Sequence, residues 1–156
     1  MNKVLILSIA KQMNDPGDLF FNKDTRGGDD DLVEYRNFEW FRGKSNECVE
    51  KRFFSFYYAA QAFIDRYRMF DKDRNSPPNE SRDILVGHPY DIESEDLLVV
   101  VHIKVLGRGK FHIISAYEAE EGSWYEEKYL MNKNLQQRVR LRRGAPVLKN
   151  PERKLK

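Results

Sequence analysis

The stretch LLVVVHIKVLGRGKFHIISA, residues 97–116, decides the fold of this chain. Its first ten residues are mostly apolar and many are β-branched, a composition typical of a buried strand. Gly107-Arg108-Gly109 follows, and glycines supply the left-handed backbone that a tight hairpin connection requires. The sequence therefore predicts two antiparallel strands, 97–106 and 110–116, joined at these glycines.

The register of this hairpin places two kinds of side chain on opposite faces. With Leu106 facing Lys110, Lys104 lies opposite His112, and successive side chains alternate between the faces. The face expected to meet the core carries Ile103, Val105, Phe111 and Ile113. The other face carries His102, Lys104, Lys110 and His112. We interpret this second face as a cationic patch with two imidazoles, a group that titrates near neutral pH. The alternatives are an ordinary solvent-facing sheet surface or a register shifted by a bulge at the glycines.

Weaker patterns on either side of the hairpin predict the remaining elements. A helix over 55–69 is expected from one apolar face formed by Ala59, Ala60, Phe63, Ile64 and Tyr67. Ser45 is the expected N-cap of a helix over 44–52. The other expected elements are strands at 4–9 and 83–87, a strand or helix start at 38–40, and loops at 15–31 and 71–81. A last helix is expected at 118–130, interrupted or started at Gly122-Ser123. The set predicts an α+β fold, in which a small antiparallel sheet packs against two or three helices.

The composition is that of a folded protein. The chain has 156 residues, 40% of them hydrophobic and 13% aromatic, and a net charge of +2, which predicts one compact domain with a packed core. No apolar run reaches the roughly 20 residues of a membrane-spanning helix, and the short run 4–10 fits a buried strand better than a secretory signal. Cys48 is the only cysteine, which excludes an internal disulfide. We expect a cytoplasmic protein.

Although the net charge of the whole chain is close to zero, two of its segments carry opposite charges. Residues 14–39 contain eight acidic and three basic side chains, whereas residues 133–156 contain nine basic and one acidic, a net charge of +8. From Arg138 to Arg143, arginines alternate with apolar residues, so an extended chain there presents guanidinium groups on one side. We predict that this segment contacts a partner, either nucleic-acid phosphates or the acidic region of this or a second copy. A solvated tail is the alternative.

The sequence lacks the common signatures of metal and cofactor sites. One cysteine and three scattered histidines do not form a zinc-binding spacing. No glycine-rich phosphate-binding loop is present, and Asp29-Asp30-Asp31 lacks the spacing of a calcium loop. We therefore expect neither a metal ion nor another cofactor.

Several short motifs, in a fixed order, resemble those of BrnT-type toxins from type II toxin–antitoxin systems. The first group is Phe38-Glu39-Trp40, Lys44, Lys51, Ser55-Phe56, Ala59-Ala60 and Phe63. The second group is 82–87, 97–101, His112-Ile113-Ile114-Ser115-Ala116 and Tyr125-Glu126-Glu127. Ile-Ile-Ser-Ala after an apolar strand is the most specific of these motifs. The resemblance covers about residues 36–130, which leaves 1–35 as an N-terminal extension with one strand and an acidic loop, and 131–156 as a basic tail.

This resemblance implies a small α+β domain similar to RelE-type toxins. It also implies a metal-independent ribonuclease that inhibits translation and is neutralised by an antitoxin, a DNA-binding repressor. The chain departs from the family pattern at Phe41 in place of Asp, at Lys51-Arg52-Phe53 in place of Lys-His-Gly, and at His112 and Tyr117 in place of Arg. Acidic residues follow within 118–121. Two basic groups of the active face are thus replaced.

The first functional prediction is a toxin-like endoribonuclease. Metal-free RNA cleavage needs a group that accepts the 2′-hydroxyl proton, cations against the phosphorane charge and an acid for the leaving oxygen. His112 is the predicted acid or base, and Lys51, Arg52 and Arg82 are the predicted phosphate-binding cations. The predicted nucleic-acid-binding residues are Lys44, His102, Lys104, Lys110, Arg138, Arg140, Arg142 and Arg143. Lys44 and Lys51 lie on one helix face roughly 10 Å apart, a spacing that suits two phosphates and equally a solvated surface.

Two other functions stay open. A degenerate toxin fold that grips a protein or nucleic acid without cutting is favoured by the acidic residues at 118–121, which repel RNA from the neighbouring sheet. A DNA-binding role centred on the basic tail is the third possibility. Homo-oligomers fit any of these functions.

Overall fold

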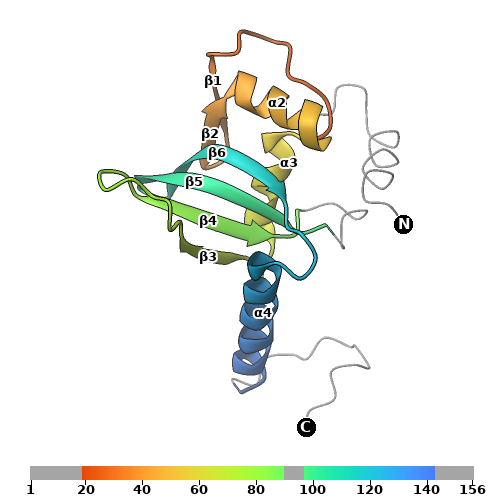
Figure 1. The fold of residues 1–156 in the computed structure, drawn as a ribbon, viewed down its shortest axis with the longest axis vertical. Coiled ribbons are helices and arrows are strands. Elements are labelled where there is room, and N and C mark those ends of the chain that lie inside the picture. Colours follow the sequence, from red (N-terminus) through yellow and green to blue (C-terminus); the bar gives the residue numbers. More distant parts are fainter. Residues whose placement is uncertain (1–18, 90–96, 143–156) are drawn as a thin grey trace.

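The structure is a computed structural model that describes residues 19–89 and 97–142. It has the expected α+β fold, with one sheet of six strands in the order β1-β2-β6-β5-β4-β3 (Figure 1). The strands are β1 (Leu32–Tyr35), β2 (Phe38–Phe41), β3 (Met69–Lys72), β4 (Arg82–Gly87), β5 (Val99–Gly107) and β6 (Lys110–Glu118). The helices are α2 (Arg42–Arg52), α3 (Phe56–Ala60), the 3-10 helix η1 (Gln61–Ile64) and α4 (Trp124–Arg142). All neighbouring strands are antiparallel except β2 and β6.

The β5–β6 hairpin has the predicted register over its centre. Lys104 lies opposite His112 and Ile103 opposite Ile113, as expected. The prediction that Leu106 faces Lys110 is wrong, because Gly107 takes that place. The turn therefore has only two residues, Arg108 and Gly109, both left-handed with φ of 55° and 73°. A two-residue turn with both φ angles positive matches the twist of the strands, and a bulge at Leu106 restores the register beyond it.

Two hydrophobic cores lie on the two faces of the sheet. The first core packs against α2 and α3, which lie beside and behind the strands in Figure 1, and its largest fully buried side chains include Trp40 and Tyr58. The second core packs against the start of α4 through the buried Tyr129. Val99 and Val101 belong to the first core and Val100 to the second. Because both faces of the sheet are covered at the start of β5, this strand begins with an unbroken apolar run.

The helix α2 begins earlier than predicted. It starts at Arg42, after a β2 residue that provides no side-chain cap. Ser45 is not its N-cap but lies buried, and its hydroxyl accepts a hydrogen bond from the Phe56 N–H at 2.9 Å. Ser55 is a true cap, since its side chain accepts from the Tyr58 N–H at the start of α3. Both serines therefore hold α3 in place.

The predicted helix over 55–69 is wrong in its second half. Helical structure ends at Ile64, and Met69 begins β3 instead. Asp65 stops the helix because its carboxylate accepts a hydrogen bond from the Tyr67 N–H at 2.8 Å, a local turn that competes with helix. The turn sends the chain back along the sheet as its edge strand β3.

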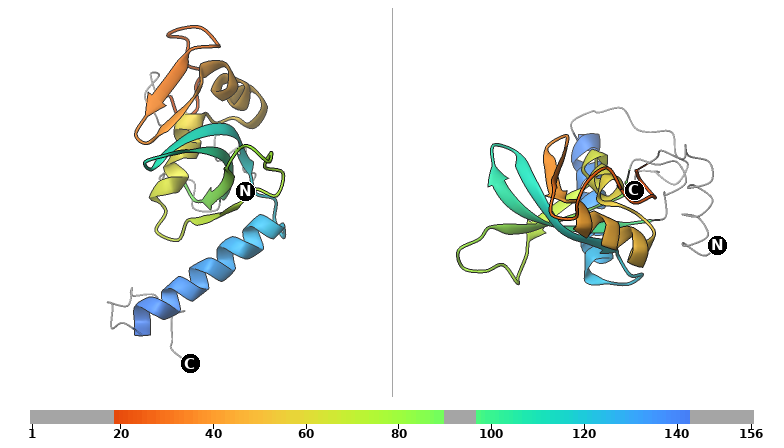
Figure 2. Two further views of the ribbon diagram at one scale, coloured as in Figure 1. Left: turned by 90° about the vertical axis from the view of Figure 1, so that its left-hand side faces the viewer. Right: turned by 90° about the horizontal axis from the view of Figure 1, so that it is seen from above.

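The predicted last helix is confirmed in its start after Gly122-Ser123 but is longer than expected, and the prediction of an extended segment from Arg138 is wrong. Glu118 ends β6, and α4 runs unbroken from Trp124 to Arg142. Residues 128–142 contain no glycine or proline and many strong helix formers. Acidic residues in its first turn and arginines in its last turn suit the helix dipole. The second half of α4 projects from the body of the protein (Figure 2). Arg143 and the expected strand at 4–9 lie outside the described residues.

The loop before β1 is tied to α2 by a buried carboxylate. Asp24 is 3% exposed and accepts hydrogen bonds from Arg26, with Arg42 at 3.3 Å. The Arg26 hydrogen bond holds the pKa of Asp24 well below its usual range. Phe21, from the same loop, is buried in the first core. Within 19–89 and 97–142 no helix is long and apolar enough to cross a membrane.

Candidate functional site

The candidate site is one face of the sheet at the end away from α4. Beyond Val101, none of the described helices packs over this side of β4, β5 and β6, and polar side chains replace the apolar ones. The residues of this surface, here called the polar face, are Glu39, Arg82, His102, Lys104, His112 and Tyr117. They come from four strands. The apolar face of Ile103 and Ile113 is buried on the other side, as the alternation predicted.

His112 is held by one carboxylate at the junction of β2 and β6. Its Nδ1 lies 2.8 Å from Glu39 Oε2, because the short parallel pairing places these two residues side by side. An Nδ1–H that donates to this carboxylate leaves the lone pair of the neutral ring on Nε2. In the part of the chain that the structure describes, Nε2 makes no hydrogen bond. The Phe41 ring packs edge-on against the imidazole at 5.2 Å.

His102 differs because both of its ring nitrogens are engaged. Nδ1 lies 2.9 Å from Asp73 Oδ2, and Nε2 lies 2.8 Å from the Tyr117 hydroxyl. Burial alone would raise the pKa of Asp73, but hydrogen bonds from His102 and from the Asn75 N–H outweigh it and lower the pKa. Burial, with a hydrogen bond to Tyr125, raises the pKa of Tyr117 well above its usual value, so this hydroxyl stays protonated.

The cations of the polar face are partly neutralised. Glu80 accepts from Arg82 Nε at 2.8 Å and lies 3.4 Å from Lys104 Nζ. Arg52, from the last turn of α2, lies 5.8 Å from the centre of the Tyr117 ring, so its guanidinium reaches the same face. Lys51 is exposed beside it, and the structure shows no contact of this side chain with the described polar face. Lys110 is exposed at the far end of β6, near the hairpin turn.

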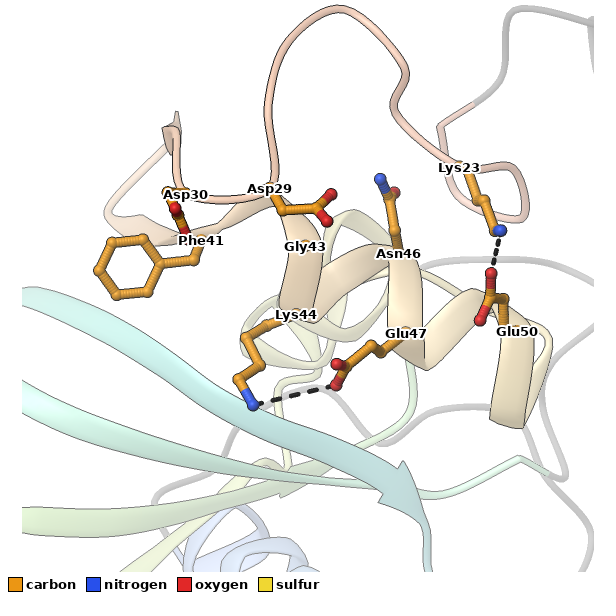
Figure 3. A pocket seen from close by; sticks show the side chains of 9 residues that line it. All are labelled: Lys23, Asp29, Asp30, Phe41, Gly43, Lys44, Asn46, Glu47 and Glu50. Carbon is orange, nitrogen blue, oxygen red and sulfur yellow. Dashed lines mark hydrogen bonds and ion pairs between the residues drawn. The ribbon is translucent and has the colours of Figure 1, made fainter.

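Lys44 lines a groove above β6, beside the polar face (Figure 3). Its ammonium points toward β6 and pairs with Glu47 at 3.9 Å. The groove has a volume of about 480 Å³ and is lined by Lys23, Asp29, Asp30, Phe41, Gly43, Lys44, Asn46, Glu47 and Glu50. Four carboxylates against two ammonium groups make it a poor surface for phosphates.

The structure does not bring the arginines of the C-terminal segment to the polar face. Arg138, Arg140 and Arg142 lie on the half of α4 that projects away from the sheet (Figure 1). The predicted nucleic-acid-binding residues thus divide into a group on or beside the polar face and a separate group on α4. Arg143 lies outside the described residues.

Sequence reasoning missed the partners of the two histidines. Glu39 lies between Phe38 and Trp40, so strand alternation could have placed its side chain on the face opposite to theirs. Its pairing with His112, however, depends on the order of the strands in the sheet. Asp73 lies in a loop that nothing in the sequence links to His102. Among residues 19–89 and 97–142, no group of three or more His, Cys, Asp or Glu side chains could bind a metal ion.

No protein-family model matches this sequence, and no curated protein matches it.

Proposed function

We propose that the protein is a toxin-like, metal-independent endoribonuclease and that His112 is its acid–base group. The observation that carries the proposal is the state of this imidazole, which Glu39 binds at Nδ1 while Nε2 has no partner among the described residues. Arg52 lies at the same face and pairs with no carboxylate within the described segments. The ordered motifs shared with BrnT-type toxins support the same activity. They also support an antitoxin partner with a DNA-binding repressor role, and a cytoplasmic location.

The proposed reaction is an intramolecular displacement at phosphorus. His112 Nε2 accepts the proton of the ribose 2′-hydroxyl, and the 2′-oxygen bonds to phosphorus as the bond to the 5′-oxygen breaks. The imidazolium returns its proton to the leaving 5′-oxygen, and Glu39 stabilises the charge on the ring between these steps. Arg52 and Arg82 offset the negative charge of the phosphorane. The products are a 2′,3′-cyclic phosphate and a 5′-hydroxyl.

The test is cleavage of total RNA by the purified protein in the presence of a metal chelator. We expect fragments that end in 2′,3′-cyclic phosphate. Expression in a bacterium should slow growth, and His112→Ala should relieve this effect without unfolding the protein. A mutant as toxic as the parent would reject His112 as the acid–base group.

A non-catalytic binding module is the second candidate, and the Glu80 contacts favour it. This carboxylate holds Arg82 and Lys104, two cations that a cleaving site needs for its substrate. The acidic residues at 118–121 add further repulsion of RNA near the end of β6. Tight RNA or protein binding without cleavage, and no growth defect, would select this function.

A further inference from the structure

One face of α4 carries a stripe of apolar and basic side chains. Lys128, Met131, Leu135, Arg138 and Arg142 recur every three or four residues, so they share one helix face. We call these five residues the α4 stripe. Met131 and Leu135, at its centre, are 63% and 61% exposed. Helix residues of this size are normally buried against a neighbour, whereas this half of α4 projects from the body of the protein (Figure 2).

The charge of the α4 stripe has one sign. Residues 128–142 contain five basic side chains and no acidic one. Arg138 and Arg142 form no ion pair in the parts of the chain that the structure describes. The groove between the stripe and β3 has a volume of about 510 Å³, and the two charged residues among those lining it, Lys128 and Arg138, are both basic. A partner for this face must therefore offer carboxylates and apolar surface together.

The groove above α2 has the complementary properties. Asp29 and Asp30 line it, and neither carboxylate has a side-chain partner among the described residues. The neighbouring Leu32 and Phe41 face each other across β1 and β2 and are 47% and 44% exposed. This end of the molecule thus combines unpaired acidic groups with exposed apolar side chains, as Figure 3 shows for Asp29, Asp30 and Phe41. We call Asp29, Asp30, Leu32 and Phe41 the acidic end.

The two surfaces lie at opposite ends of the protein, with α2 and β1 at one end and α4 at the other (Figure 1). The α4 stripe and the acidic end of one copy therefore cannot contact each other. We propose that the α4 stripe of one copy docks on the acidic end of a second copy. Met131 and Leu135 pack against Leu32 and Phe41, while the arginines of the stripe pair with the two aspartates. Such a head-to-tail contact builds rings or open chains.

A second copy fits these surfaces better than a nucleic acid does. Phosphates would satisfy the arginines but would leave Met131 and Leu135 against a polar backbone. The second copy supplies both carboxylates and apolar surface, and steering between opposite charges speeds the encounter. The contact does not depend on the ribonuclease proposal, because it uses neither His112 nor the polar face.

Sedimentation velocity of the full chain, treated with nuclease, tests the proposal. At low salt the average mass should rise with protein concentration, and about 0.5 M salt should return it to the monomer. Arg138→Glu with Arg142→Glu should weaken association at least tenfold, and so should Asp29→Lys with Asp30→Lys. Arg108→Glu with Lys110→Glu, on the distant hairpin, is the matched control and should associate as the parent does.

Mixing the two charge-reversed proteins is the decisive step. Each lacks one complementary surface, but an equal mixture again offers opposite charges at every contact, so association should return. A parent that stays monomeric at all concentrations would overturn the proposal. So would association that depends on nuclease-sensitive material, or reversed variants that associate as the parent does. Failure of the mixture to associate would also overturn it, and would assign the α4 stripe to a different partner.

Discussion

The two histidines of the polar face lie on adjacent strands with similar side-chain exposure, 17% for His112 and 18% for His102, but they differ in their hydrogen bonds. His112 is bound at one nitrogen by Glu39. His102 is bound at both, between Asp73 and Tyr117. A proton-transfer group needs a nitrogen that can reach the substrate, and only His112 offers one among the described contacts. The number of free nitrogens, more than exposure, separates a candidate catalytic residue from a structural one.

His102 and its two partners, here called the His102 cluster, join separate parts of the sheet. Asp73 follows β3, His102 lies on β5 and Tyr117 lies on β6, where it also packs against the second core. Hydrogen bonds across such partly buried groups fix the position of the strands. The imidazole of His102 therefore stabilises the fold, whereas that of His112 is available for catalysis.

The largest effect is expected from His112→Ala, which removes the proposed acid–base group. Loss of a general acid–base group lowers a rate by about 10²–10⁴, so RNA cleavage per folded molecule should fall at least 100-fold. The free energy of unfolding should change little, because the ring has one hydrogen bond. Glu39→Gln keeps a polar partner but removes the charge that stabilises the imidazolium, and should give a smaller loss. Initial rates on a fluorescent RNA measure both, and cleavage retained within threefold in His112→Ala would contradict the assignment.

His102→Ala should have the opposite profile. It removes the two hydrogen bonds of the imidazole, one with the Asp73 carboxylate and one with the Tyr117 hydroxyl, and hydrogen bonds in proteins contribute about 0.5–1.5 kcal/mol each. We expect lower stability in urea and nearly unchanged cleavage per folded molecule. Tyr117→Phe, which removes only the hydroxyl, is the milder control. A variant as stable as the parent that has lost cleavage would reverse the roles of the two histidines.

The face that carries both histidines could be predicted from the sequence, but their partners could not. Strand alternation is local, so the hairpin alone placed His102 and His112 together. The partners depend on non-local features. Glu39 reaches His112 through a parallel β2–β6 pairing, and Asp73 reaches His102 from a loop after an edge strand that the sequence pattern did not predict. Neither pairing leaves a periodic signal.

The errors at the helices have local physical reasons. Asp65 ends a helix that apolar spacing extended to residue 69, because its side chain competes for a backbone N–H. The alternating arginines of 138–142 suit a strand, but they follow a run of strong helix formers that extends α4 through them. An alternation over five residues is too short to outweigh a continuing helix.

Acid should weaken the His102 cluster through Asp73. The folded-state pKa of this carboxylate is lowered, so the unfolded chain binds its proton more readily. Its stabilisation is therefore complete above the ordinary pKa of 3.8 and is lost as the pH falls through the lower folded-state value. The difference in urea midpoint between the parent and Asp73→Asn should be constant from pH 7 to 5 and should shrink below about pH 4. A difference in urea midpoint that grows below pH 4 would contradict this prediction, because Asp73 would then stabilise the protein more when it is protonated.

The smallest effect is expected from Glu80→Gln, which tests whether the cations beside the two histidines bind RNA. The carboxylate pairs with Arg82 and Lys104 at a partly exposed surface, where ion pairs are weak. Its loss frees both cations for phosphates, so the affinity for a non-cleavable single-stranded oligonucleotide should rise about two- to fivefold. The salt dependence should steepen, because each further phosphate contact releases a counterion. Lys104→Ala should act in the opposite direction, and fluorescence anisotropy at two salt concentrations measures both. Unchanged affinity in both variants would place RNA binding away from the polar face and leave His112 without a substrate beside it.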